Sequence, residues 1–225
     1  QTLYFKINAA DLAGRSTVLY ERVEYSGVDV IVHEDINNGD QTVNFPYGGT
    51  SATDSETEDH IANADEEVTI YDEVKYHNLT PGASYTAKGT LMDKETGEPV
   101  TVGGSPVTGE TQFTADQADG SVIVEFRFSG IALKGKTTVA FETVESEGKV
   151  VFVHEEIGDN DQTVYFPSVE TNAKDGEDGD KMIDHSGTVT IVDEVSYRNL
   201  IPGRKYVVSG VLMDKKTGRA AKADS

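Results

Sequence analysis

Residues 68–76 read VTIYDEVKY, and this stretch decides the fold. Apolar and polar side chains alternate along it, which is the period-two pattern of a β-strand with one buried face. The apolar face holds two valines, an isoleucine and Tyr76, and Asp72 is the single carboxylate on that face. An unpaired carboxylate among apolar side chains is costly, so we expect Asp72 to be protonated or paired.

The same pattern returns 121 residues later as VTIVDEVSY at 189–197. A second pair of segments repeats at the same offset, VHEDINNGDQTVNFP at 32–46 and VHEEIGDNDQTVYFP at 153–167. Self-similarity at a period of this length is the sequence signature of a tandem array of domains.

The repeat divides the chain into three parts. Residues 1–46 are the C-terminal part of one repeat, 47–167 a complete repeat, and 168–225 the N-terminal part of the next. The sequence lacks an initiator Met and opens in a strand-like stretch, so we expect it to be a piece of a longer protein.

The complete repeat has the pattern of short strands separated by turns such as NLTPG and DKETG. A helical period of 3.6 residues is missing. We therefore predict an all-β fold of tandem immunoglobulin-like (CnaB-like) β-sandwich repeats, one complete and two partial. The strands expected in the complete repeat are 67–76, 83–93, 99–102, 110–114, 121–129, 136–146, 150–154 and 162–167.

Composition excludes several classes of function. The net charge of −21 argues against binding to nucleic acid or to anionic membrane surfaces, and the sequence has no apolar run that would insert into a membrane. Cysteine is absent, so neither a disulfide nor a thiolate metal site can form. A β-domain outside the cell would need another kind of cross-link.

Five polar residues recur at the 121-residue period. Strand alternation places each of them on an apolar face, where they must meet one another or leave several buried groups unsatisfied. The five pairs are Thr50 and Thr171, Asp72 and Asp193, Glu21 and Glu142, His33 and His154, and Gln41 and Gln162.

This set of side chains allows one particular reaction. Thr50 supplies a hydroxyl nucleophile, Gln162 a carboxamide that can lose ammonia, and His154 a base for the hydroxyl proton. Asp72 and Glu142 in an apolar site would share one proton, and the protonated carboxyl would polarise the Gln162 carbonyl. The product is an ester between Thr50 and Gln162. Each domain reacts once, so we expect no enzymatic turnover, and the chemistry uses no cofactor or metal.

The quoted segments resemble the Thr–Gln ester-bond domains, often called VaFE repeats, of Gram-positive surface adhesins. The matching stretches are TSATD, YDEVKYHNLTPGASYTAKGTLMDKETGEPV, TVAFE and HEEIGDNDQTVYFP, and the first repeat departs only in having TVLYE for TVAFE. The resemblance implies an ester between Thr50 and Gln162 assisted by Asp72, Glu142 and His154. It also implies an extracellular, cell-wall-anchored stalk, whose cross-links give mechanical and proteolytic resistance. Adjacent repeats would be its partners, and other domains would bind any host-surface ligand.

Two details of the repeat bear on which threonine reacts and on how many esters the chain can form. Thr53 lies three residues after Thr50, but its counterpart at 174 is a lysine, so the repeat favours Thr50 as the nucleophile. The two terminal parts together lack a counterpart of residues 105–121, which include an expected strand. We therefore predict a single ester in the chain, Thr50 to Gln162, with the flanking parts incomplete.

Three other functions fit parts of the sequence. A Lys–Asn isopeptide domain needs an inward lysine, yet Lys75 faces away from the apolar side and Lys88 aligns with a valine in the next repeat. An adhesin module that binds a metal or a glycan would use the His and carboxylates, with the acidic run at 175–180 as a calcium candidate. A Thr–His–Asp hydrolase would need a nucleophile elbow or a glycine-rich oxyanion loop, and the sequence has neither.

Overall fold

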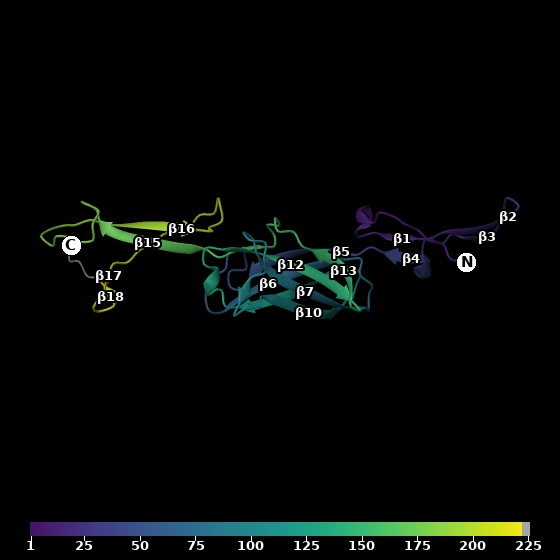
Figure 1. Ribbon diagram of the computed structural model, residues 1–225, viewed down its shortest axis with the longest axis horizontal. Coiled ribbons are helices and arrows are strands. Elements are labelled where there is room, and N and C mark those ends of the chain that lie inside the picture. The colour runs from purple at the N-terminus through teal and green to yellow at the C-terminus, as the bar shows by residue number, and fades with distance from the viewer. Residues whose placement is uncertain (222–225) are drawn as a thin grey trace.

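The structure, a computed structural model, describes residues 1–221 and is nearly all β. It confirms the immunoglobulin-like β-sandwich expected from the alternating pattern. A central sandwich contains the complete repeat, and the two partial repeats extend from opposite ends of it (Figure 1). Three short 3₁₀ helices interrupt the strands of the described part, η1 (Ala10–Leu12), η2 (Gly39–Gln41) and η3 (Ile131–Leu133).

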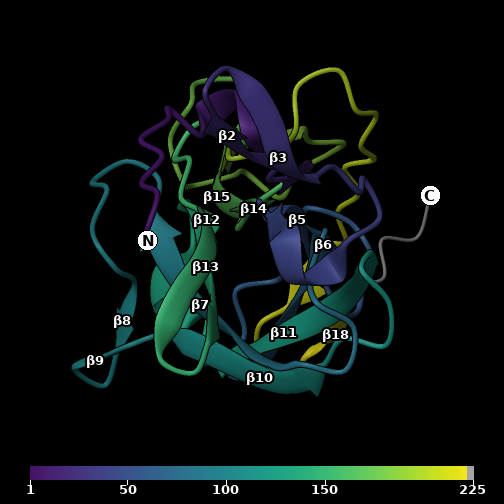
Figure 2. The same cartoon turned by 90° about the vertical axis from the view of Figure 1, so that its right-hand side faces the viewer.

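Two antiparallel sheets form the central sandwich, and the view along the long axis shows them facing one another (Figure 2). The first has the order β10 (Thr108–Thr114), β7 (Ser84–Asp93), β12 (Thr137–Ser146) and β13 (Lys149–His154), with β14 (Thr163–Tyr165) also paired to β12. The second has the order β11 (Gly120–Phe128), β6 (Val68–His77) and β5 (Tyr47–Asp54). A small hairpin of β8 (Thr101–Val102) and β9 (Ser105–Pro106) lies outside both sheets.

The core lies between these sheets and follows the alternation of the sequence. Along β6, every second side chain from Val68 to Tyr76 is buried, and Asp72 is among them. Phe126 on β11 is fully buried and packs over Gly89 on β7, where an added Cβ would lie 2.4 Å from its ring. The absence of a side chain at Gly89 thus lets the facing sheets approach at this point.

Both flanking parts keep the hairpins of the complete repeat. In the N-terminal part, Glu21 faces His33 as Glu142 faces His154, and in the C-terminal part Thr171 faces Val195 as Thr50 faces Val74. The N-terminal strands are β1 (Ser16–Val18), β2 (Glu21–Tyr25), β3 (Val28–His33) and β4 (Thr42–Asn44). The C-terminal strands are β15 (Ser168–Asp175), β16 (Ile191–Arg198), β17 (Met213–Asp214) and β18 (Arg219–Ala220).

Consecutive repeats are joined by a Phe-Pro pair and nothing longer. Strand β4 ends at Asn44 and β5 begins at Tyr47; in the same way β14 leads into β15. At the first junction Asn78 donates from Nδ2 to the carbonyl of Arg15 (2.6 Å), and the Tyr47 ring stacks on the ring of His77 with centroids 4.7 Å apart. The connection is therefore a packed contact rather than a free linker.

Strand β5 was not among the strands expected from the sequence. Its Gly48 and Gly49 remove the alternation that marks a strand, but Gly48 is needed because the ring of Phe152 on β13 would lie 2.3 Å from an added Cβ. The stretch expected at 99–102 is shorter than predicted and forms only β8. None of the helices in residues 1–221 combines the length and the hydropathy that a membrane span requires.

We predict that Gly89→Ala destabilises the sandwich. The new methyl group overlaps the Phe126 ring, and overpacking of this kind costs about 1–3 kcal/mol of unfolding free energy. Urea unfolding should be measured in a Thr50→Ala background, so that no cross-link contributes. Gly49→Ala is the matched control, since nothing lies within 4 Å of its added Cβ. Equal stability of the two variants would contradict this packing argument.

Candidate functional site

The five residues singled out by the repeat come from five strands or strand ends. Thr50 lies on β5 and Asp72 on β6, in one sheet, whereas Glu142 lies on β12, His154 at the end of β13 and Gln162 just before β14, in the other. Four of the five side chains are buried between the sheets: Thr50, Asp72, Glu142 and Gln162. The His154 side chain is 21% exposed to solvent.

Glu142 brings the nucleophile and the electrophile together. The Thr50 hydroxyl donates to Glu142 Oε2 (3.1 Å), and the Gln162 carboxamide contacts the same oxygen through Nε2 (2.5 Å). In this orientation the buried Gln162 Oε1 has no hydrogen-bond donor among the described residues. Half a turn of the amide exchanges its nitrogen and oxygen, and a protonated Glu142 would then donate to the Gln162 carbonyl.

Both sheets hold the backbone around Gln162. The N–H of Ala52 on β5 donates to the carbonyl of Asp161 (2.9 Å), and the N–H of Ala140 on β12 donates to the carbonyl of Gln162 (3.1 Å). These bonds fix the carboxamide between the edge of one sheet and the centre of the other. The nucleophile and electrophile are thus positioned by rigid strands on either side of the core.

Asp72 and Glu142 form a buried carboxyl pair. Burial, followed by the hydrogen bond and the charge of Asp72, raises the pKa of Glu142 to about 10. Burial also raises the pKa of Asp72, while hydrogen bonding to Glu142 and the nearby charge of His154 act in the opposite direction. With both groups ionised, neither Asp72 oxygen would have a donor, and Glu142 Oε1 would have none either. A proton shared by the pair would supply a donor between the two carboxyl groups, and the raised pKa of Glu142 favours its protonated form.

His154 is oriented by a residue that the sequence analysis missed. Its Nε2 lies 2.8 Å from Asp159 Oδ2, and this histidine holds the pKa of Asp159 below its usual value against the opposing effect of burial. Since the carboxylate accepts from Nε2–H, the lone pair of Nδ1 is left free. The sequence does carry a signal for this partner, because a polar residue follows the histidine by five positions in both repeats: Asp159 after His154 and Asn38 after His33. In the first repeat Asn38 contacts His33 Nε2 (3.0 Å).

Comparison with known proteins assigns the family. The model of the T-Q ester bond containing domain matches residues 1–45, 47–166 and 167–225. The chain belongs to this ester-bond domain family. The match confirms the resemblance seen in the quoted segments. No curated protein matches the chain.

Solved structures give distant likenesses. A bacterial adhesin from Mobiluncus mulieris with intramolecular disulfide, isopeptide and ester bond cross-links is 13% identical, with 68% of this chain and 75% of that one covered and a TM-score of 0.45. A second crystal form of that adhesin gives a TM-score of 0.42 over the same shares at 13% identity. A glycosyl hydrolase family 2 member from Bacteroides cellulosilyticus is 12% identical, with 62% and 16% covered and a TM-score of 0.39.

Thr53, the competing nucleophile, lies outside the site of this ester-bond repeat. Along β5, Thr50, Ala52 and Asp54 are buried, and Thr53 falls on the opposite face, next to Tyr71 of β6. Strand alternation therefore separates the two threonines, and only Thr50 contacts Glu142.

The flanking parts do not assemble their own copies of the site. At one end, Glu21 contacts His33 Nδ1 (3.2 Å) and Gln41 is half-buried in η2. Thr171 and Asp193 lie at the other end of the molecule, exposed on the β15–β16 hairpin.

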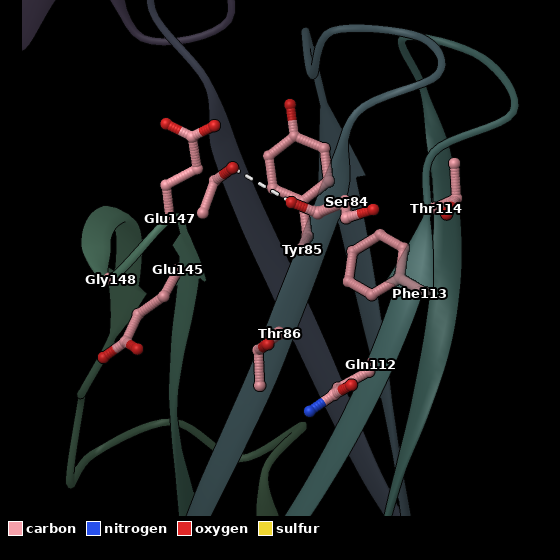
Figure 3. Close-up of a pocket in the computed structure, with 10 residues that line it drawn as sticks. Ser84, Tyr85, Thr86, Gln112, Phe113, Thr114, Glu145, Glu147 and Gly148 are labelled. Carbon is pink, nitrogen blue, oxygen red and sulfur yellow. Dashed lines mark hydrogen bonds between the residues drawn. The ribbon is translucent and has the colours of Figure 1, made fainter.

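One hollow of the described surface has none of the five site residues in its lining (Figure 3). It has a volume of about 590 Å³ and lies between β7, β10 and the β12–β13 turn, where Ser146 donates to the carbonyl of Ser84 (2.9 Å). Phe113 at its wall stacks against the rings of both Tyr76 and Tyr85, so it is already engaged in aromatic contacts. This geometry gives no support to a glycan-binding function.

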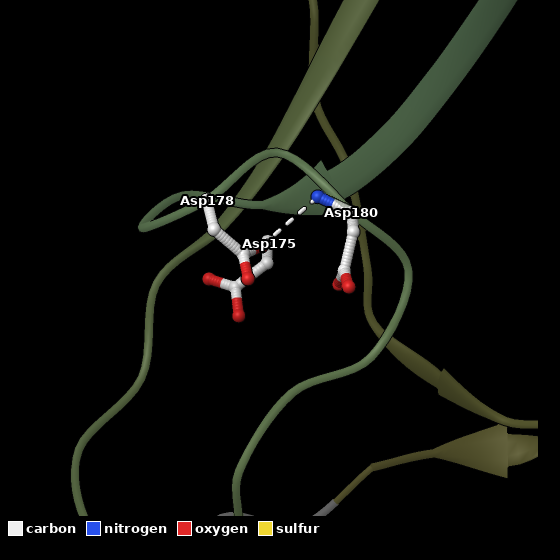
Figure 4. A group of neighbouring side chains, drawn as sticks. All are labelled: Asp175, Asp178 and Asp180. Atoms are coloured by element: carbon white, nitrogen blue, oxygen red, sulfur yellow. Dashed lines mark hydrogen bonds between the residues drawn. The ribbon is translucent and has the colours of Figure 1, made fainter.

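The acidic run considered for calcium is a loop whose carboxylates close turns (Figure 4). Oxygens of Asp175, Asp178 and Asp180 lie within 4.8 Å of one another. Each of these side chains already accepts a backbone N–H two residues further along the chain, at 2.6–3.0 Å. Their role in closing these turns is sufficient to explain why the three carboxylates lie close together.

We predict that the unreacted repeat loses stability as pH rises. Folded Glu142 has a pKa of about 10 against an ordinary value of 4.5, so the folded state keeps a proton that the unfolded state releases between those values. This contribution is complete at low pH and is lost as pH rises toward the folded pKa, by up to about 1.4 kcal/mol per pH unit. Thermal unfolding of Thr50→Ala followed by circular dichroism should show Tm falling as pH rises from about 4.5 toward about 10.

Glu142→Gln in the same Thr50→Ala background is the control. It cannot titrate at that position, so its Tm should depend less on pH. If the two curves fall in parallel, the proton is not held by Glu142.

Proposed function

We propose that residues 47–167 cross-link themselves through an ester between Thr50 Oγ1 and Gln162 Cδ, with release of ammonia. The observation that carries the proposal is the position of both groups on one buried carboxyl oxygen, Glu142 Oε2. Family membership supports it independently.

The residues around the bond take separate roles in this proposal. Protonated Glu142 donates to the Gln162 carbonyl and stabilises the charge that develops on its oxygen. The Thr50 hydroxyl is then free to turn its proton toward His154, which Asp159 orients. Oxygen attacks Cδ, the C–N bond breaks, and the proton taken from Thr50 leaves on ammonia. Asp72 keeps the shared proton on the pair by raising the pKa of Glu142.

The cross-link would connect the first strand of the repeat to its last. It closes a loop of more than 100 residues, and a cross-link of that span stabilises by about 4.7 kcal/mol on a chain-entropy model. Force entering at Gln41 or leaving at Thr171 would cross the repeat through the ester and bypass the hydrogen bonds of both sheets. Unfolding under force and cleavage by proteases would both be suppressed.

We further propose that the chain is part of the stalk of an extracellular, cell-wall-anchored bacterial adhesin, without enzymatic turnover. Three domain matches in series and junctions of two residues support a rod of repeats. The first junction is packed, at Asn78 and Arg15, which suits a stalk more than a string of independent modules.

Intact mass tests the ester directly. The mass of the freshly purified, folded monomer should be lower than the mass calculated from its sequence by one ammonia. Thr50→Ala and Gln162→Ala should each restore the full mass, whereas Thr53→Ala, on the opposite face of β5, should keep the deficit. A full-length mass for the folded wild-type monomer would refute the proposal.

The role of His154 is tested by rate. His154→Ala should slow bond formation by about 10²–10⁴-fold, the usual contribution of a general base, in protein refolded from urea and sampled by mass. Asp159→Asn should also slow it, because the amide donates to Nε2 and moves the imidazole proton to Nδ1.

Asp161→Asn is the matched control for this series, since its exposed side chain has no contact with His154 in the described structure. A normal rate for His154→Ala with the sandwich folded would remove histidine from the mechanism.

A further inference from the structure

One turn of the complete repeat carries two groups of the proposed ester chemistry. Residues 159–163 lead into β14 and contain both Asp159, which contacts His154, and Gln162, which contacts Glu142. A displacement of this turn would move the electrophile and the partner of the base together, and a misplacement of about 1 Å can slow a reaction by about 10²-fold. Whatever fixes the turn therefore bears on the rate.

A buried hydroxyl closes this turn. Thr163 is fully buried, and its Oγ1 donates to the carbonyl of Asp159, four positions earlier. On Asp159 itself, Oδ1 accepts from the N–H of Asp161 (2.8 Å), and the backbone N–H donates to the carbonyl of Glu156 (3.0 Å). The peptide group and the carboxylate of Asp159 are thus each held by their own bonds, which keeps Oδ2 in place for His154.

Lys94 fixes the direction of that hydroxyl. Its Nζ lies 2.8 Å from Thr163 Oγ1. An ammonium group can only donate, so the Thr163 oxygen accepts from Lys94, and its single proton is left for the Asp159 carbonyl. The bond from Lys94 is charge-assisted, which makes it stronger than a bond between neutral groups. The two side chains together therefore favour one arrangement of the turn.

The backbone of Lys94 is anchored on β12, the strand that carries Glu142. Lys94 directly follows β7, and its N–H donates to the carbonyl of Thr137 (2.9 Å). Beside it, Asp93 pairs with Lys136 (2.9 Å), the residue just before β12. The ammonium group is therefore supplied from a fixed point of the sheet to which Glu142 belongs.

The first repeat closes its turn in the same way. Thr42 is the counterpart of Thr163 at the 121-residue period, and its Oγ1 donates to the carbonyl of Asn38 (2.8 Å). Asn38 also contacts His33 Nε2. The partner of the histidine thus differs between the two repeats, whereas the threonine that holds this partner is the same in both. The lysine recurs as well, as Lys215 in the third part of the chain.

A second buried threonine supports the same strands without reaching the site. Thr138 on β12 is fully buried, and its Oγ1 donates to the carbonyl of Val164 on β14 (3.3 Å). This bond joins two strands of the sheet, and its acceptor is neither a group of the site nor a partner of one. Thr163 differs because its acceptor is the residue that orients the base. The two hydroxyls can therefore be compared directly.

We propose that Thr163 and Lys94 are positioning residues of the ester-forming reaction. They hold the turn at 159–163, and with it the partner of the histidine and the reacting carboxamide. The inference rests on the proposed ester and adds no bond-forming step to it. Neither side chain forms a hydrogen bond with Thr50 or Glu142 within residues 1–221, so both act through the turn.

The rate of ammonia loss in the full chain tests this. Protein refolded from urea is sampled by intact mass, and circular dichroism shows when the sandwich has formed. Thr163→Val keeps the shape of the side chain without its hydroxyl, and it should lose ammonia up to about 10²-fold more slowly than wild type. Thr163→Ser keeps a hydroxyl and should restore most of the rate. Lys94→Met should also slow the reaction, because the hydroxyl loses the donor that directs it.

Two variants serve as matched controls. Thr138→Val removes a buried hydroxyl from the same sheet, and Lys136→Met removes the ion pair with Asp93. Both should react at about the wild-type rate once folded, even where thermal unfolding in a Thr50→Ala background shows a lower Tm.

A double variant separates positioning from stability. His154→Ala has no base to be positioned, so adding Thr163→Val to it should slow the reaction by a smaller factor than in wild type. Equal factors in the two backgrounds would mean that the hydroxyl acts only on the fold, and the proposal would be wrong.

The outcomes keep this inference apart from the ester itself. If wild type loses ammonia and Thr163→Val does so at the same rate, or Thr138→Val is slowed as much, the positioning role is wrong while the ester stands. If Thr163→Val does not fold, Lys94→Met and Lys136→Met decide, and equal rates for these two would overturn the proposal. A folded wild type that has lost no ammonia would refute the ester, and the positioning role with it.

Discussion

The contact of Thr50 and Gln162 with one oxygen of Glu142 is the interaction on which the repeat depends. Each group comes from a different strand or strand end, and these elements belong to the two sheets that face each other across the core. A carboxyl group that stayed ionised there would be too costly to bury without a donor for every oxygen. The raised pKa of Glu142 resolves this, because the protonated group is cheaper to bury and is also the form that polarises an amide carbonyl. The same burial therefore serves the stability of the sandwich and the reactivity that we propose for it.

The histidine shows how a second contact can differ between repeats while the geometry stays the same. In the complete repeat a carboxylate, Asp159, accepts from His154 Nε2; in the first repeat the amide of Asn38 faces the corresponding nitrogen of His33. A carboxylate can only accept, whereas an amide nitrogen can only donate. The two repeats thus place the imidazole proton on different ring nitrogens, and His33 Nδ1 correspondingly lies near an acceptor, Glu21. Repeats of one array can in this way differ in how readily their histidine takes a proton.

Sequence reasoning predicted most of the residues that the structure brings together at the candidate site, because two independent patterns agreed. Alternation alone placed Asp72 on the buried face of its strand, and the structure has it there. Thr50 was found only through the 121-residue period, since the glycines before it hide the strand that carries it. Asp159 was missed because it lies in a turn, where alternation has no meaning, and because its counterpart is a different residue. The alternation predicts which face of a strand a side chain lies on, but not its rotamer or how the two sheets pack. Distances such as that between His154 and Thr50 depend on both, so the sequence could not predict them.

The Phe-Pro junction sets what a string of such repeats does when it is pulled. Gln41 and Thr50 are nine positions apart, as are Gln162 and Thr171, and this short extended stretch is the whole path between one cross-link and the next. The remaining residues of each repeat never enter that path once the ester has formed. With the proposed esters formed, an array of such repeats would have no folded length to release under tension. Tension would then pass from one end of the array to the other without extending it.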